Sequence, residues 1–142
     1  MNVAKLLAVK RQILKVPSQF GMTRYFFTDV NHFNNKYELK REKIPNCGTA
    51  GCIAGWAVAL EEFQGSPAEA YKAYSRSPHR RAQFLLDLTE IEAERLFYLT
   101  PSAHESWPPQ FREAYQAAKR LRDRARVAAR RIDHFIKTGG RE

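Results

Sequence analysis

The stretch Cys-Gly-Thr-Ala-Gly-Cys-Ile-Ala-Gly-Trp-Ala, which begins at Cys47, opens an apolar run that constrains the fold more than any other feature. No charged residue occurs in the eleven positions from Ala50 to Leu60. Eleven residues are too few to span a bilayer, so the run predicts a buried helix over about 50–63. Thr49 is the expected N-cap, because its hydroxyl can accept a hydrogen bond from a first-turn amide.

Two glycines four residues apart, Gly51 and Gly55, lie inside this predicted helix. Each costs roughly 1 kcal/mol relative to alanine in a helix interior. Close packing of another backbone against the glycine side would offset that cost, so we expect a central helix with a close neighbour. The opposite side of the predicted helix carries its bulky residues, Cys52, Ile53, Trp56, Leu60 and Phe63.

Start and stop signals along the rest of the chain are mostly helical. They predict a helix over 3–16 and a long last helix over about 109–137 that ends at Gly139. Three shorter helices are expected to begin at Ser66-Pro67-Ala68-Glu69, at Ser77-Pro78, and at the capping box Thr89-Glu90-Ile91-Glu92.

Residues 21–47 do not follow the helical pattern, because Tyr25-Phe26-Phe27 favours extended structure and several asparagines favour turns. We expect an irregular segment there, with a short hairpin. The predicted architecture is therefore all-α. It is a single helical domain, 1–142, built as an orthogonal bundle around the central apolar helix.

The pattern Cys-Gly-Thr-x-x-Cys-Ile-Ala-Gly-Trp-Ala resembles a motif of small uncharacterised bacterial and phage-encoded proteins. Segments 17–22, 88–97 and 132–139 also resemble that group, so the resemblance covers most of the chain. It implies no established activity, and therefore no catalytic residues and no cofactor.

The composition is 44% apolar with 17 aromatic residues among 142, which suits one domain with a substantial core. The N-terminal region lacks the apolar block and cleavage site of a secretory signal, so a cytoplasmic protein with reduced thiols is expected. No apolar run is long enough to predict a membrane span.

The net charge of +9 is unevenly distributed. Residues 1–28 carry five basic and no acidic side chains, residues 29–118 have a net charge of −2, and residues 119–142 have a net charge of +6. Both ends of the chain are basic, while the middle is not.

Cys47 and Cys52 form the candidate thiol site. In the first turn of a helix, Cys52 would feel a field that favours thiolate, and Cys47 could approach it to form a reversible disulfide. The alternative is structural, since Cys52 shares a helix side with Trp56 and buried cysteines behave as small hydrophobic residues. The five-residue spacing also differs from the C-x-x-C of redox proteins.

Other catalytic and metal motifs are missing from the sequence. The four histidines occur singly, without the spacing of a zinc site. Hydrolase, metalloprotease and phosphate-loop signatures are absent too. We therefore assign no catalytic residue, no metal site and no cofactor. The glutamates 90, 92 and 94 are accounted for by capping and by the helix dipole.

The last helix carries the strongest surface signal, a set of basic residues opposite its apolar stripe. Phosphate and carboxylate groups would favour such a face, and guanidinium suits bidentate contacts. The alternative is a solvated helix face, with some of its arginines paired to acids of the middle segment. The candidate anion-binding residues are Arg120, Arg122, Arg124, Arg126, Arg130 and Arg131.

Three functions from different classes follow. The first is a non-enzymatic binding module that contacts an anionic partner, nucleic acid or an acidic protein surface, through the last helix, with no membrane partner. The second is a thiol-dependent enzyme or redox-responsive protein that uses Cys52 and Cys47. The third is a helical oligomerisation protein whose basic charge is incidental.

Overall fold

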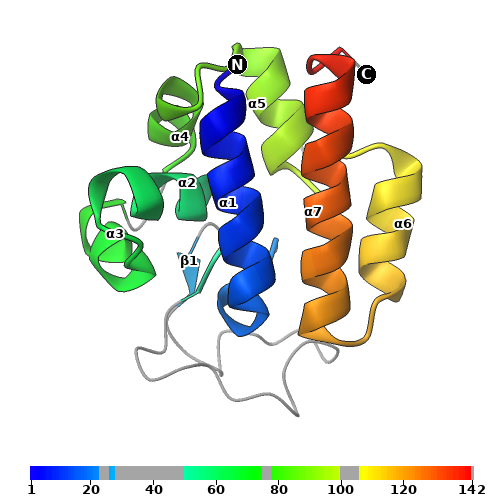
Figure 1. Ribbon diagram of the computed structural model, residues 1–142, viewed down its shortest axis with the longest axis horizontal. Coiled ribbons are helices and arrows are strands. Elements are labelled where there is room, and N and C mark those ends of the chain that lie inside the picture. Colours follow the sequence, from blue (N-terminus) through cyan, green and yellow to red (C-terminus); the bar gives the residue numbers. More distant parts are fainter. Residues whose placement is uncertain (23–25, 28–49, 75–77, 100–105, 142) are drawn as a thin grey trace.

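The computed structural model of the protein describes residues 1–22, 26–27, 50–74, 78–99 and 106–141. Its architecture is all-α, as the sequence predicts (Figure 1). The elements are α1 (Val3–Lys15), the 3-10 helix η1 (Pro17–Gln19), β1 (Phe26–Phe27), β2 (Ala50–Gly51), α2 (Ile53–Glu62), α3 (Pro67–Tyr74), α4 (His79–Leu85), α5 (Glu90–Phe97), α6 (Pro109–Ala117) and α7 (Leu121–Thr138).

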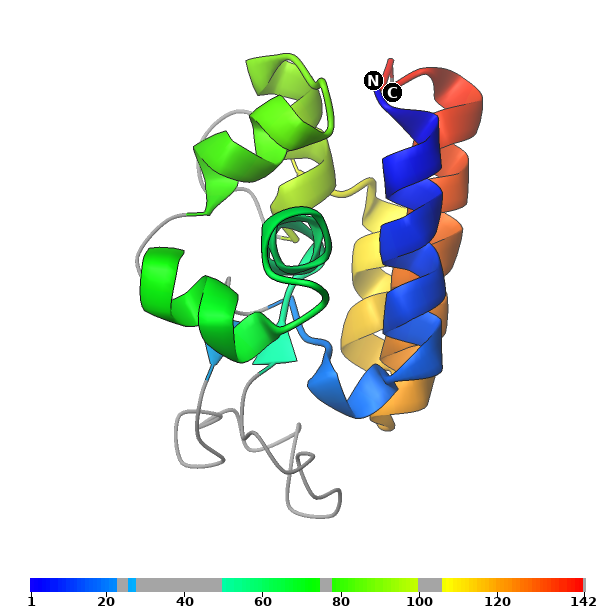
Figure 2. The same cartoon turned by 60° about the vertical axis from the view of Figure 1, so that its left-hand side comes forward.

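Helix α2 lies at the centre of the fold, which confirms the predicted buried helix. Every residue from Ile53 to Ala59 is buried. The view along its axis shows α1 on one side of α2 and α3 and α4 on the other (Figure 2). Because α2 runs across the direction of α1, the bundle is orthogonal (Figure 1). The indole of Trp56 is fully buried, and its Nε1 donates to the carbonyl oxygen of Gln19 at 3.0 Å.

The predicted start of this helix is wrong by three residues. α2 begins at Ile53, its N-cap is Cys52 rather than Thr49, and Gly51 belongs to strand β2. Gly51 pairs with Phe26 in an antiparallel ladder, and it forms a parallel bridge with Phe20 on its other side. Glycine is a weak helix former, so these pairings prevail over helix extension. Another backbone does approach Gly51, but as a strand partner.

The predicted irregular segment, 21–47, falls mostly outside the described residues. Within it, Phe26–Phe27 are extended, as predicted, but their partner strand is Ala50–Gly51, which lies outside this segment and was predicted to be helical. The remainder, 28–49, includes Cys47 and lies in the part of the chain that the structure does not describe.

Three other local helix signals are confirmed. Thr89 and Glu92 form the capping box: Thr89 Oγ1 accepts from the Glu92 amide at 3.3 Å, and Glu92 Oε2 accepts from the Thr89 amide at 2.8 Å. Pro67 is the first residue of α3, as predicted. Gly139 ends α7 in the left-handed conformation, with φ 62°.

The predicted single helix over 109–137 is wrong, because it divides into α6 and α7. The backbone is extended at Ala118 (ψ 121°) and at Arg120 (ψ 143°), although neither residue disfavours a helix by propensity. The break lets α6 fold back along α7, which buries Tyr115 and the apolar side of α7. Tertiary packing thus outweighs continued helix formation.

Helix α7 lies between α1 and α6 in one layer of three helices (Figure 1). α1 and α7 run in opposite directions, so the N- and C-terminal ends of the chain meet at the same end of the layer (Figures 1 and 2). The two basic ends of the sequence therefore become neighbours on one side of the molecule.

Candidate binding surface on the C-terminal helix

The thiol of Cys52 is buried beneath the start of α2, with 2% of the residue exposed. Loss of solvation raises its pKa from 9.0 to about 11, although the amides of Gly55 and Ala54 pull the pKa back in part. The thiol is therefore protonated near neutral pH, which favours the structural role over a thiolate nucleophile. Cys47 lies outside the described residues, so the structure does not address its pairing with Cys52.

His79 is the half-buried histidine of α4. Its ring stacks on Tyr98 with centroids 5.4 Å apart and meets the ring of Phe97 edge-on at 5.2 Å. Burial lowers the pKa of His79, which favours the neutral ring. Within the described part of the chain, no three potential metal-ligating side chains come together. The aromatic contacts give His79 a packing role.

Two of the predicted anion-binding residues, Arg124 and Arg131, do not belong to an exposed face. The structure corrects both, because 5% of Arg124 and 0% of Arg131 are exposed. The two positions are seven residues apart, and both flank the apolar stripe of α7 on the side that α6 covers. Their position beside the apolar stripe was the sequence signal that could have identified these two arginines as buried.

The side chain of Arg124 links α7 to the C-terminal end of α6. Its Nε donates to the carbonyl oxygen of Ala118 at 2.9 Å, and its guanidinium lies over the Tyr115 ring at 5.4 Å. Carbonyls at a helix C-terminus lack intrahelical partners, so this hydrogen bond caps α6. The role of Arg124 is structural.

The side chain of Arg131 links α7 to the C-terminal part of α5. Its Nη2 donates to the carbonyl oxygen of Arg95 at 2.8 Å. The guanidinium also lies over the rings of Phe111 and Phe135, with 5.8 Å and 5.3 Å to their centroids. Packing and hydrogen bonding therefore account for the burial of this charge.

The other four predicted residues are exposed, and we call them the basic face: Arg120, Arg122, Arg126 and Arg130. The last three follow each other at four-residue spacing, so they form one stripe along α7. Arg126 pairs with Asp123 at 3.4 Å on the same helix. Among the described residues, no acid of segment 29–118 pairs with the basic face.

The basic face does not stabilise α7 through the helix dipole. Arg120 is the N-cap, Arg122 is in the first turn, and Asp123 is the acidic residue of that turn. Cations at a helix N-terminus are unfavourable by roughly 0.3–1 kcal/mol each. The helix dipole therefore gives no reason for Arg120 and Arg122 at this end of α7.

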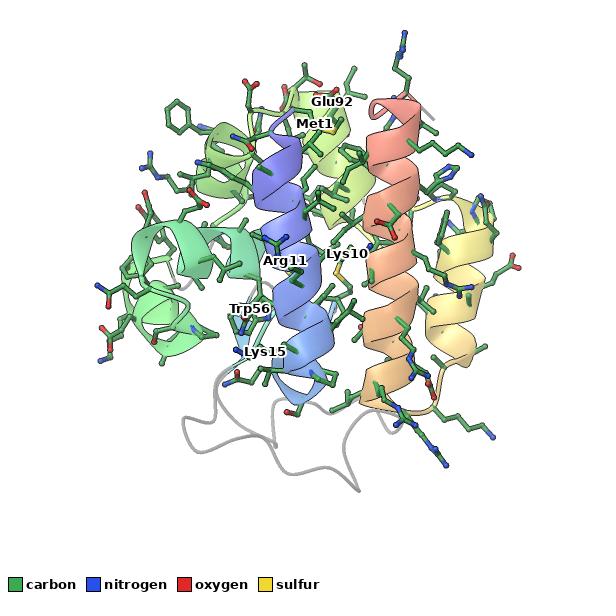
Figure 3. All side chains as sticks on the ribbon, viewed as in Figure 1. Met1, Lys10, Arg11, Lys15, Trp56 and Glu92 are labelled. Atoms are coloured by element: carbon green, nitrogen blue, oxygen red, sulfur yellow. The ribbon has the colours of Figure 1, made fainter. Side chains whose placement is uncertain are left out.

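Helix α1 adds cations beside α7 that the sequence reasoning did not assign to the site. Arg11 and Lys15 are exposed on α1 (Figure 3). Lys10 reaches α7 and binds Asp133, with its Nζ 2.6 Å from Oδ1 and 2.8 Å from Oδ2. The absence of acids from residues 1–28 was the available signal, but only the fold shows that α1 lies against α7.

An open groove of about 710 Å³ runs over the outer side of the α1–α7–α6 layer. Its apolar part is formed by Leu14, Ala114, Ala117, Ala118, Val127 and Ala129, and its charged part by Lys10, Asp123, Arg126, Arg130 and Asp133. The basic face thus borders a concave surface with an apolar lining. Such a surface offers contacts to charged and apolar groups of one partner at the same time.

No protein-family model, curated protein or solved structure matches the chain. The resemblance to small bacterial and phage-encoded proteins stays an expectation from the sequence motif. Across the part of the chain that the structure describes, no helix combines the length and apolar character needed to cross a bilayer.

Proposed function

We propose that this protein is a non-enzymatic binding module that contacts an anionic partner, nucleic acid or an acidic protein surface, in the cytoplasm. Contact is made through the basic face on α7, and the neighbouring helix α1 adds positive charge to this side of the molecule. The observation that carries this proposal is the exposed stripe Arg122, Arg126 and Arg130. Within the described residues, its only ion pair is the 3.4 Å contact of Arg126 with Asp123 on the same helix.

The alternative is an ordinary solvated face with some arginines paired to acids of the middle segment, and for the basic face those pairs are missing among the described residues. Four of the described acids of that segment pair elsewhere: Glu61 with Lys5, Glu62 with Arg81, Glu69 with Lys72, and Asp87 with the amino group of Met1. Exposed, uncompensated cations on a rigid helix lose little side-chain entropy per contact with an anion, because guanidinium is pre-organised. This supports recognition of carboxylate or phosphate groups.

The burial of the Cys52 thiol weakens the enzymatic alternative. A nucleophile must reach its substrate, and it must be available as thiolate near neutral pH. The positive charge, by contrast, is on the surface. Binding is therefore the function that the described side chains support best.

The experiment compares two triple variants of equal charge. Arg122→Glu/Arg126→Glu/Arg130→Glu removes the basic face, and Lys72→Glu/Arg80→Glu/Arg141→Glu makes the same change of −6 at exposed positions elsewhere. The probes are a mixed-sequence DNA duplex, single-stranded RNA and polyglutamate. Four phosphate contacts predict an affinity that falls about a hundredfold between 50 and 200 mM salt.

We expect the basic-face variant to lose binding to at least one probe, while the control variant keeps most of it. If both variants lose affinity equally, net charge alone governs binding and the assignment of the surface is wrong. If the unmodified protein binds none of the probes at 50 mM salt, the proposed function itself is wrong.

A further inference from the structure

The groove beside the basic face is lined by small apolar residues from two helices. Ala114 and Ala117 come from α6, Ala118 follows it, and Ala129 comes from α7. Small side chains let another helix approach closely, since interaxial distance depends on the side chains at the contact. The groove therefore allows an apolar helix face to approach closely.

Leu14, at the edge of this groove, is accessible to solvent in the folded protein. Leu14 of α1 is 42% exposed, and Ala117 on the opposite side is exposed as well. Both side chains would lose contact with water if an apolar ligand occupied the groove, and burial of apolar surface is favourable. The apolar lining thus offers affinity that a purely ionic contact would not use.

The charges of the groove form two ion pairs, Lys10 with Asp133 and Arg126 with Asp123, and leave Arg130 outside them. Three cations, Lys10, Arg126 and Arg130, and two acids, Asp123 and Asp133, give the lining a net charge of +1. Arg130 has no acid within ion-pair distance in the part of the chain that the structure describes. The lining therefore suits one or two carboxylates placed beside an apolar stripe.

We propose that this groove binds an amphipathic helix of a partner protein whose apolar stripe is flanked by acidic side chains. The apolar stripe of the partner helix lies on Leu14 and Ala117, and the acidic side chains of the partner helix lie beside Arg126 and Arg130. The inference rests on the proposed function and names the class of anionic partner. The partner helix would pack on the three-helix layer as α7 packs on its neighbours.

Other occupants fit these features less well. Duplex DNA presents one negative charge per about 1.7 Å and would meet Asp123 and Asp133 in the groove, while leaving Leu14 unused. A second copy of this chain also carries a net charge of +9, so two basic surfaces would repel each other. An acidic amphipathic helix suits both the apolar lining and the positive charge of Arg130.

The test uses an 18-residue synthetic peptide, as long as α7, with leucines on one helical face and glutamates flanking them. A scrambled peptide of the same composition keeps the charge and loses the stripe. A DNA duplex is the third probe. Affinity is measured by fluorescence anisotropy, and we expect the amphipathic peptide to bind about tenfold or more tightly than the scrambled one.

Neutral variants separate the groove from the charge. Leu14→Gln and Ala117→Gln should each weaken binding of the amphipathic peptide several-fold, because both place a polar amide against its stripe. Val3→Gln is the matched control, because Val3 is also exposed on α1, at 39%, and does not line the groove. All three positions are on the surface, and thermal melts confirm that each variant is folded.

Equal affinity for the two peptides, or tighter binding of the duplex, would overturn this inference. So would an amphipathic peptide whose affinity is unchanged by Leu14→Gln and Ala117→Gln. In these cases the proposed function survives if the polyanions still depend on Arg122, Arg126 and Arg130. Failure of every probe to bind would remove the proposed function first.

Discussion

Lys10 Nζ lies 2.6 Å from Asp133 Oδ1, and this ion pair joins the N-terminal helix α1 to the C-terminal helix α7. The two residues are 123 positions apart in the sequence. Each belongs to one of the two basic ends of the chain, and the pair sits in the lining of the groove. The contact therefore holds two positively charged helices side by side and lowers the charge of the surface between them.

Asp133→Asn should raise the affinity for polyglutamate about threefold, because it leaves the charge of Lys10 uncompensated in the groove. The free energy of unfolding should fall by only about 0.5 kcal/mol, since both partners are partly exposed. Glu69→Gln is the control: it removes an exposed acid paired with Lys72 on α3 and changes the net charge equally. An equal gain in affinity for both variants would show that the groove has no special role.

Arg131→Ala should lower the free energy of unfolding by about 3 kcal/mol. The change leaves the Arg95 carbonyl without this donor and opens a cavity between Phe111 and Phe135. Arg130→Ala, its exposed neighbour, should cost less than about 0.5 kcal/mol. Urea denaturation measures both variants, and similar losses would contradict the structural role of Arg131.

Arg131→Met gives a finer comparison. Methionine keeps much of the packing against the two rings but donates no hydrogen bond, so we expect a loss of about 1–2 kcal/mol. A loss as large as that of Arg131→Ala would mean that packing contributes little at this position.

Gly140→Ala should destabilise the protein by about 1 kcal/mol more than Gly139→Ala. Both glycines have positive φ, 73° and 62°, so each substitution carries the cost of a left-handed conformation. At Gly140, a Cβ would also lie 2.9 Å from Glu92 Cγ and 3.2 Å from Phe135 Cζ, whereas at Gly139 the nearest atom is 3.8 Å away. Thermal melts of the two variants test the difference, and equal losses would contradict the close contact with α5.

Burial of Cys52 predicts a loss of stability at alkaline pH. Its folded-state pKa, about 11, exceeds the ordinary 9.0, so between these values the folded protein holds a proton that the unfolded chain releases. The free energy of unfolding should therefore fall as pH rises from 9 to 11, by about 2–3 kcal/mol in total. Cys52→Ala should show a correspondingly shallower decline in urea titrations over this range, and parallel curves would contradict the burial of an ionisable thiol.

Thiol labelling provides an independent check on Cys52. In a Cys47→Ser variant, a maleimide at pH 7.5 should react with Cys52 only at the rate of unfolding. Fast labelling of the folded protein would restore the interpretation of Cys52 as a reactive thiol.

The sequence by itself determined those features whose causes lie within a few residues. The apolar run Ile53–Ala59 had to be buried, because no charged group interrupts it. Thr89 and Glu92 are three residues apart and complete their capping box without help from the rest of the chain. The same is true of Gly139, since the left-handed residue that ends α7 is set by local backbone geometry.

Only the tertiary structure decided what depends on distant neighbours. Gly51 leaves the helix because the backbones of Phe20 and Phe26 pair with it. The spacing along α7 places Arg124 and Arg131 beside the apolar stripe, but it does not show their partners, which are carbonyl oxygens and aromatic rings supplied by α6 and α5. The basic surface spans two helices because α1 packs on α7. Hydrogen bonds and burial between residues far apart in the sequence stabilise these arrangements. Sequence patterns reflect only the preferences of adjacent residues.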